Sequence, residues 1–255
     1  MREKATLTFV LLFLVALIVL PLFVVFLLSI VPRWSTAFPT SFSLEWWTAI
    51  LKPKFMKIVI NTLIVSIFST GLTVGYGILA AYLFAFYEFR GKQLLLVLIL
   101  SPTYVSGIVI ALGLLTAYPY LRNTVWIMVL GHFIIISPVV FRYVLSSMVS
   151  IPPILIETSY VLGASPLRTL YSIILPLSKQ GIIAGTILSI GMTISELSVS
   201  LLLFGPEWVT LSIQIYLERG WGTLGIAGVL STILICLALL TTFIVNYMDK
   251  THGRN

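Results

Sequence analysis

The sequence ETSYVLGASPLRTLYSIILP, residues 157–176, predicts a short helix, a sharp turn and a second short helix. Gly163 is placed at the turn because glycine ends a helix in the left-handed conformation without steric cost. Ser165 is a good N-cap, and Pro166 suits the first position of a helix, where no amide donor is needed. Pro176 is expected to end the second helix, because a proline ring interrupts helical hydrogen bonding.

Apolar side chains recur at helical spacing on both sides of this turn. Each predicted helix is too short to bury such a face by itself, so another surface must receive it. On the first helix the face comprises Ile154, Leu155, Thr158, Val161 and Leu162. On the second helix it comprises Leu167, Leu170, Tyr171 and Ile174.

The composition of the chain is that of a membrane protein. Its 255 residues are 59% hydrophobic and 9% charged, whereas soluble domains carry about 25% charged residues. About 20 apolar residues are enough to cross a bilayer as a helix. Six runs satisfy this length, at residues 5–32, 58–87, 93–121, 123–141, 180–206 and 221–248. The sequence therefore predicts an all-α membrane protein with six transmembrane helices.

The net charge of +7 indicates topology, because Lys and Arg gather in loops on the cytoplasmic side of a membrane. With the N-terminus inside, the inner segments carry nine basic residues and the outer segments six. Both termini are therefore expected in the cytoplasm, and nucleic acid is not an expected partner. The predicted organisation is a first helix with an outer interfacial segment (1–56), a five-helix core (57–248) containing a cytoplasmic loop (146–178), and a cytoplasmic tail (249–255).

The spacing within the bent stretch resembles that of a known family. Glu157 is followed by Gly163 six residues later, by Ile173 ten residues further on, and then by Leu175 and Pro176. This pattern resembles the signature loop of binding-protein-dependent ABC importer permeases. In that family the loop forms a coupling helix that docks on a separate ATPase subunit. The resemblance implies the fold of a type I importer permease.

The family usually has two alanines after the glutamate, and this chain has Thr158 and Ser159 instead. The ATPase-coupling loop that the resemblance implies comprises Glu157, Thr158, Ser159, Leu162, Gly163, Ala164, Ser165, Pro166, Leu167 and Pro176. The implied function is that of a permease subunit of an ATP-driven importer, which forms the solute path in the inner or plasma membrane. The implied partners are two ABC ATPase subunits, a second permease copy or paralogue, an extracellular substrate-binding protein and the lipid bilayer.

No motif for catalysis or for holding a cofactor occurs in the sequence. A phosphate-binding loop of the form Gly-x-x-x-x-Gly-Lys-Ser/Thr is absent, since Gly91-Lys92 has neither the upstream glycine nor the hydroxyl residue. Cys236 is the single cysteine, and no Cys/His cluster suggests a metal site. We therefore expect no catalytic residue, no metal and no cofactor in this chain, with ATP bound by the partner ATPase.

Glu196 is expected near the middle of the fifth membrane helix, where a charged side chain costs about 2.5–3.5 kcal/mol. A residue this costly is a candidate for the translocation path, together with Ser195 and Ser198. The alternative is a structural hydrogen bond between helices or across a dimer. The run 196–203 resembles permeases for iron(III), thiamine, polyamines and aminoethylphosphonate. Sulfate and molybdate permeases share the glutamate, so the cargo stays open.

A rival function is also open at this point. Glu196 and His132 lie within apolar runs and suit the proton-carrying pair of an ion-coupled secondary transporter. A lone histidine in a helix bundle is, however, also typical of a hydrogen bond to a neighbouring helix. An integral-membrane enzyme is a third class, but the sequence offers no catalytic constellation for it.

Overall fold

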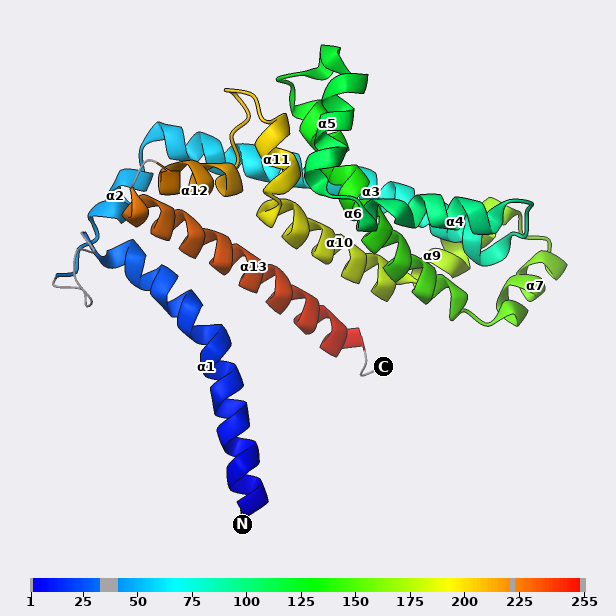
Figure 1. The fold of residues 1–255 in the computed structure, drawn as a ribbon. Helices are drawn as coiled ribbons and strands as arrows, with labels where there is room; N and C mark the ends of the chain where they lie inside the picture. The colour runs from blue at the N-terminus through cyan, green and yellow to red at the C-terminus, as the bar shows by residue number, and fades with distance from the viewer. Residues whose placement is uncertain (1, 33–40, 221–222, 253–255) are drawn as a thin grey trace. The chain divides into compact units, whose positions relative to one another are not determined.

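The computed structural model describes residues 2–32, 41–220 and 223–252, and these ranges are helical, without a strand (Figure 1). The chain divides into two compact units. One comprises Met1–Val59 with Leu211–Cys236, and the other comprises Ile60–Thr210 with Leu237–Asn255. The second unit contains the bent stretch and most of the candidate residues.

The helices follow one another along the chain with short connections. Three of them are long: α1 (Arg2–Ile30), α3 (Pro53–Phe86) and α13 (Leu224–His252). The helices of intermediate length are α4 (Lys92–Leu100), α5 (Gly107–Ala117), α6 (Val125–Val149), α7 (Pro153–Val161), α10 (Lys179–Ser195) and α12 (Leu211–Gly220). The short elements are α2 (Glu45–Ile50), η1 (Ser101–Tyr104), η2 (Pro119–Leu121), α8 (Pro166–Thr169), η3 (Leu170–Ile174), α9 (Leu175–Leu177) and α11 (Ser198–Leu203).

Helix α6 is the centre of the second unit and lies against α10, α5 and α11 (Figure 1). Small residues allow this close packing, as is common between membrane helices. A Cβ atom on Gly77 of α3 would lie 3.0 Å from Val140 Cγ1 of α6. A Cβ atom on Gly181 of α10 would lie 2.7 Å from the Tyr143 carbonyl oxygen. Larger residues at these two glycines would therefore push α3 and α10 away from α6.

The first unit is held in part by a tryptophan. The Trp46 indole nitrogen donates a hydrogen bond to the Val31 carbonyl (3.1 Å), which links α2 to the end of α1. The same ring lies against Gly225 at the start of α13, where a Cβ atom would collide with it.

Several helices are apolar and long enough to cross a membrane. In the described ranges, three qualify by themselves: Thr6–Ile30, Pro53–Phe86 and Val125–Val149. Two further pairs qualify if each bent pair is one span, Lys92–Tyr104 with Gly107–Ala117 (108°) and Pro166–Leu177 with Lys179–Ser195 (71°). Leu224–Leu240 is a shorter apolar helix. The predicted all-α membrane fold is confirmed, while the count of six spans and the orientation of the termini stay predictions.

Candidate functional site

The predicted turn at Gly163 is confirmed. Helix α7 ends at Val161, and Gly163 adopts φ = 81°, in the left-handed region that favours glycine. The Gly163 amide donates to the Tyr160 carbonyl (3.0 Å), and the Ala164 amide donates to the Ser159 carbonyl (3.0 Å). Together these two bonds form a Schellman motif, which satisfies carbonyls at the end of a helix.

The second helix begins as predicted and ends within one residue of the prediction. The Ser165 side chain accepts a hydrogen bond from the Arg168 amide (3.4 Å), and Pro166 takes the first helical position. The helix continues through η3 and α9 as Pro166–Leu177 and so ends one residue after Pro176, where a bend of 71° follows. The π-helical turn Leu170–Ile174 precedes Pro176, and a wider turn leaves room for the proline ring.

Residues 153–177 form the bent segment. Its apex, at the turn between the two helices, is apolar and exposed. Val161 and Leu162 are 86% and 81% exposed. All five residues of the predicted first face are exposed: Ile154, Leu155, Thr158, Val161 and Leu162. The prediction that the chain itself does not bury this face is therefore confirmed.

The predicted second face is divided between two environments. Leu170 and Ile174 are buried in the core with Phe141 and Val144 of α6. Leu167 and Tyr171 point away from that core and are exposed. The prediction that these four residues share one face was therefore wrong in its environment, because α6 covers the part that carries Leu170 and Ile174 and leaves Leu167 and Tyr171 exposed.

Two open hollows lie beside α7 in the second unit. One, of about 460 Å³, lies between α7 and the following helix and is lined by Leu162, Ile173 and Arg168 among others. The other, of about 400 Å³, lies between α7 and the ends of α3 and α6, and Glu157 and Tyr160 line it. Glu157, the first residue of the signature, is thus exposed at the surface of a hollow.

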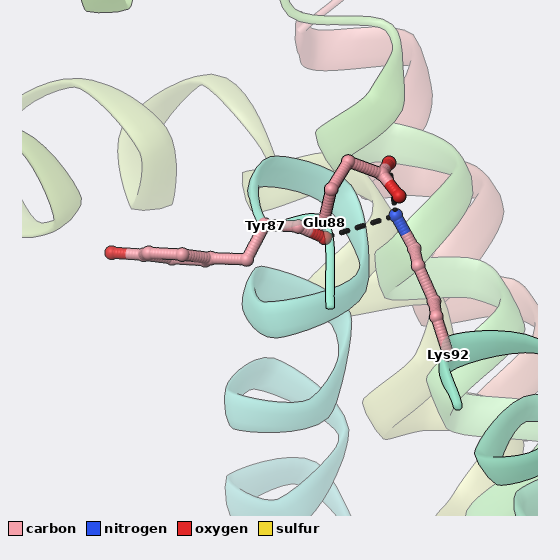
Figure 2. Close-up of polar contacts among 3 residues, drawn as sticks. All are labelled: Tyr87, Glu88 and Lys92. Atoms are coloured by element: carbon pink, nitrogen blue, oxygen red, sulfur yellow. Dashed lines mark hydrogen bonds and ion pairs between the residues drawn. The ribbon is translucent and has the colours of Figure 1, made fainter. Parts of the chain in front are cut away.

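A second glycine turn connects α3 to α4. Gly91 adopts φ = 84° there. The Lys92 ammonium donates to the Tyr87 carbonyl (3.0 Å) and to a Glu88 carboxylate oxygen (2.7 Å), as Figure 2 shows. Because the carboxylate is exposed, this ion pair contributes little stability. The glycine of this turn has the same backbone conformation as the glycine of the bent segment. The turn does not, however, carry a pair of apolar side chains as exposed as Val161 and Leu162.

Glu196 does not lie in the middle of a helix, contrary to the prediction. Helix α10 ends at Ser195, Glu196 is extended (ψ = 119°), and α11 begins at Ser198. The Glu196 carboxylate accepts a hydrogen bond from the Val199 amide (3.1 Å), so it caps the first turn of α11. Such a bond satisfies an amide that has no partner within its helix. The contact is a local cap of α11 rather than the predicted bond between helices or across a dimer, and the role in a path stays a prediction.

The two serines beside Glu196 are both exposed. The Ser195 hydroxyl donates to the Gly191 carbonyl of its own helix (3.0 Å). A side chain that is satisfied by its own backbone is the usual state of a serine inside a helix. Ser195 ends α10 and Ser198 begins α11, so both serines lie at a break rather than within a span, and their role in a path stays a prediction.

His132 is 1% exposed in α6, and its Nε2 atom lies 2.7 Å from the Ser200 hydroxyl of α11. The predicted hydrogen bond to a neighbouring helix is confirmed. The sequence analysis did not identify Ser200, nor Thr169, whose hydroxyl lies 2.9 Å from that of Ser159. No sequence signal marks either partner, since each belongs to a different helix from the residue it contacts.

The comparisons with known proteins bear on this arrangement of a bent segment and a bundle. The family described as "Binding-protein-dependent transport system inner membrane component" matches residues 73–251, more than half of the chain. The chain belongs to this family.

Curated relatives support the same assignment. The 2-aminoethylphosphonate transport system permease protein PhnV of Salmonella typhi is 25% identical, over 92% of this chain and 90% of its own length. The spermidine/putrescine transport system permease protein PotC of Escherichia coli is 28% identical, over 83% and 82%. Both classes of permease were among those that the sequence analysis found similar around Glu196.

Solved importers share the fold. A bacterial ABC transporter that imports the acidic polysaccharide alginate aligns with a TM-score of 0.75 at 17% identity, over 98% of this chain and 95% of that one. The methionine transporter MetNI, in an inward-facing conformation, aligns with a TM-score of 0.63 at 14% identity, over 79% and 99%. The protein is a multi-pass inner-membrane permease subunit of an ABC importer, and family membership decides against the secondary transporter.

Proposed function

We propose that the bent segment is the surface through which separate ATPase subunits drive the permease. The exposure of Val161 and Leu162 carries the proposal, because two large apolar side chains stand at the tip of a turn that is fixed by backbone hydrogen bonds. A contiguous exposed apolar patch is typical of a protein interface. ATP-driven movement of the ATPase subunits pushes on this tip and moves the helices behind it.

The proposed assembly contains two ATPase subunits, two permeases and an extracellular substrate-binding protein. The second permease is an identical copy or a paralogue. ATP binds to the ATPase subunits alone, since this sequence lacks a phosphate-binding loop. The bent segment and both termini face the cytoplasm, in keeping with the excess of Lys and Arg in the segments on that side.

The test replaces Leu162 with aspartate in the full complex. Burial of a leucine side chain contributes about 1.5–3 kcal/mol, so Leu162→Asp should weaken binding of the ATPase subunits at least roughly tenfold. The matched control is Leu51→Asp, which alters a leucine of similar exposure (74%) outside the segment. Copurification of the ATPase subunits with each variant measures the effect. Equal recovery with both variants would contradict the proposal.

We propose further that the cargo is a small solute bearing an aliphatic amine. Support comes from the names of two sets of relatives, since 2-aminoethylphosphonate, spermidine and putrescine share this group. Calorimetric titration of the cognate substrate-binding protein with these three compounds, and with sulfate as the control, tests it. Binding of at least one amine and no binding of sulfate is expected. Binding of sulfate alone would overturn the assignment of the cargo and leave the coupling proposal intact.

A further inference from the structure

The bent segment contains a buried pair of hydroxyl groups that links its two helices. Ser159 of α7 and Thr169 of α8 are 6% and 0% exposed. Their hydroxyl oxygens lie 2.9 Å apart. We infer that this pair is a positioning link, which keeps the two helices of the bent segment at a fixed angle while the ATPase subunits push on its apex. The inference depends on the proposed function.

The hydrogen-bond pattern gives the pair a direction. The Ser159 hydroxyl lies 2.7 Å from the Ile156 carbonyl, and the Thr169 hydroxyl lies 3.2 Å from the Ser165 carbonyl. Each hydroxyl has one proton to donate. If Thr169 donates to Ser159 and Ser159 donates to Ile156, both protons are used at the two shortest distances. The result is a continuous chain of bonds from α8 to the backbone of α7.

Ser159 also holds the turn through its backbone. Its carbonyl accepts the Ala164 amide in the Schellman motif (3.0 Å), two residues before the second helix begins. One residue therefore fixes the turn with its carbonyl and the second helix with its hydroxyl. Loss of the hydroxyl leaves the turn intact and removes the side-chain contact alone.

The link lies between the anchors of the segment and its exposed apex. Ile156 of α7, and Leu170 with Ile174 of the second helix, are buried in the core around α6. Val161 and Leu162 project from the other end. Without a bond between the two helices, they can pivot about the turn, and a push on the apex is absorbed there. With the bond, the push reaches the core residues of both helices together.

A threonine outside the bent segment provides a matched control. Thr48 of α2 is exposed, and its hydroxyl donates to the Glu45 carbonyl of its own helix (2.8 Å). Thr48→Ala thus removes a hydroxyl that does not link two helices. Ser159 stands where the family usually has alanine, so by family resemblance alone Ser159→Ala should be equally harmless. The inference predicts that the two variants differ.

The experiment measures the coupling ratio, the number of solute molecules transported per ATP hydrolysed. The whole complex, with ATPase subunits and substrate-binding protein, is reconstituted in lipid vesicles. In Ser159→Ala and in Thr169→Val the ratio should fall about fivefold, as expected for loss of one buried hydrogen bond. Thr48→Ala should leave it unchanged, and so should Thr169→Ser, which keeps the hydroxyl. The double variant should be no worse than either single one, because both remove the same bond.

The ratio separates a positioning role from simple destabilisation. A variant that assembles poorly lowers uptake and ATP hydrolysis together, so the ratio does not change. A wild-type ratio in both Ser159→Ala and Thr169→Val would overturn the inference. If Leu162→Asp loses the ATPase subunits in the same preparation, the proposed function stands and only this inference fails. If Leu162→Asp still binds them, the proposed function itself fails.

Discussion

Two interruptions of helix in the second unit are built in opposite ways. At the apex of the bent segment, Gly163 takes a left-handed conformation and Ser165 starts the next helix. Between α10 and α11 there is neither glycine nor proline, only Leu197 and an extended Glu196, whose carboxylate caps the helix that follows. The first interruption is specified by the backbone preferences of its own residues. The second depends on a side chain and on the surfaces against which α11 packs.

The surroundings of the two interruptions differ as well. The apex of the bent segment is exposed, whereas Val199 and Leu203 of α11 are buried. A Cβ atom on Gly131 of α6 would lie 2.5 Å from Val199 Cγ1 and 2.6 Å from Leu203 Cδ1. His132 adds a hydrogen bond to Ser200 from the same helix. The apex is thus free to meet a partner, while the break at Glu196 is held within the chain.

The largest effect is expected from Gly163→Val. No heavy atom lies within 4 Å of a Cβ at this position, so the cost is conformational rather than steric. A left-handed conformation costs an ordinary L-residue about 1–2 kcal/mol, and β-branched residues are the least tolerant of it. The strain should open the turn and lower solute uptake about 5- to 30-fold. Uptake per permease in the membrane, with the amount measured by immunoblot, checks this.

Gly91→Val is the matched control for that substitution. Gly91 has nearly the same φ, 84° against 81°, and equally open surroundings. The backbone strain is therefore the same in both variants, but Gly91 lies outside the bent segment. We expect Gly91→Val to retain most of the uptake. Equal losses of uptake in the two variants would show that backbone strain at any such turn lowers uptake. The bent segment would then not differ from other turns.

What the sequence predicts well is local. The turn at Gly163, the cap at Ser165 and the exposed face around Leu162 each follow from a residue and its near neighbours. The end of the second helix was predicted to within one residue, although Pro176 alone does not reveal the π-helical turn that precedes it.

What the sequence does not predict depends on tertiary contacts. The burial of Leu170 and Ile174 requires knowing which side of the helix α6 covers. The bond between His132 and Ser200 joins two residues far apart in the chain. After the break at Glu196, α11 packs closely against Gly131, whereas hydropathy alone makes 180–206 look like one continuous helix.

A smaller effect is expected at Glu196, where two variants separate a structural role from a path role. Glu196→Ala removes the oxygen that accepts the Val199 amide, and loss of a helix cap costs about 1 kcal/mol. Glu196→Gln keeps an oxygen acceptor and removes the charge. If the carboxylate mainly caps α11, the alanine variant unfolds at a lower temperature in detergent, and the glutamine variant retains both stability and uptake.

Thr116→Ala is the control for these two variants, because its exposed hydroxyl donates to the Leu112 carbonyl of its own helix (2.8 Å), away from Glu196 in the sequence. It should change neither melting temperature nor uptake. Loss of uptake in Glu196→Gln at unchanged melting temperature would contradict the structural role and place the negative charge on the solute path. In that case the break between α10 and α11 would be the site that contacts the solute, while the bent segment is the site that contacts the ATPase. Both helix interruptions would then take part in transport, one through the solute and the other through the ATPase.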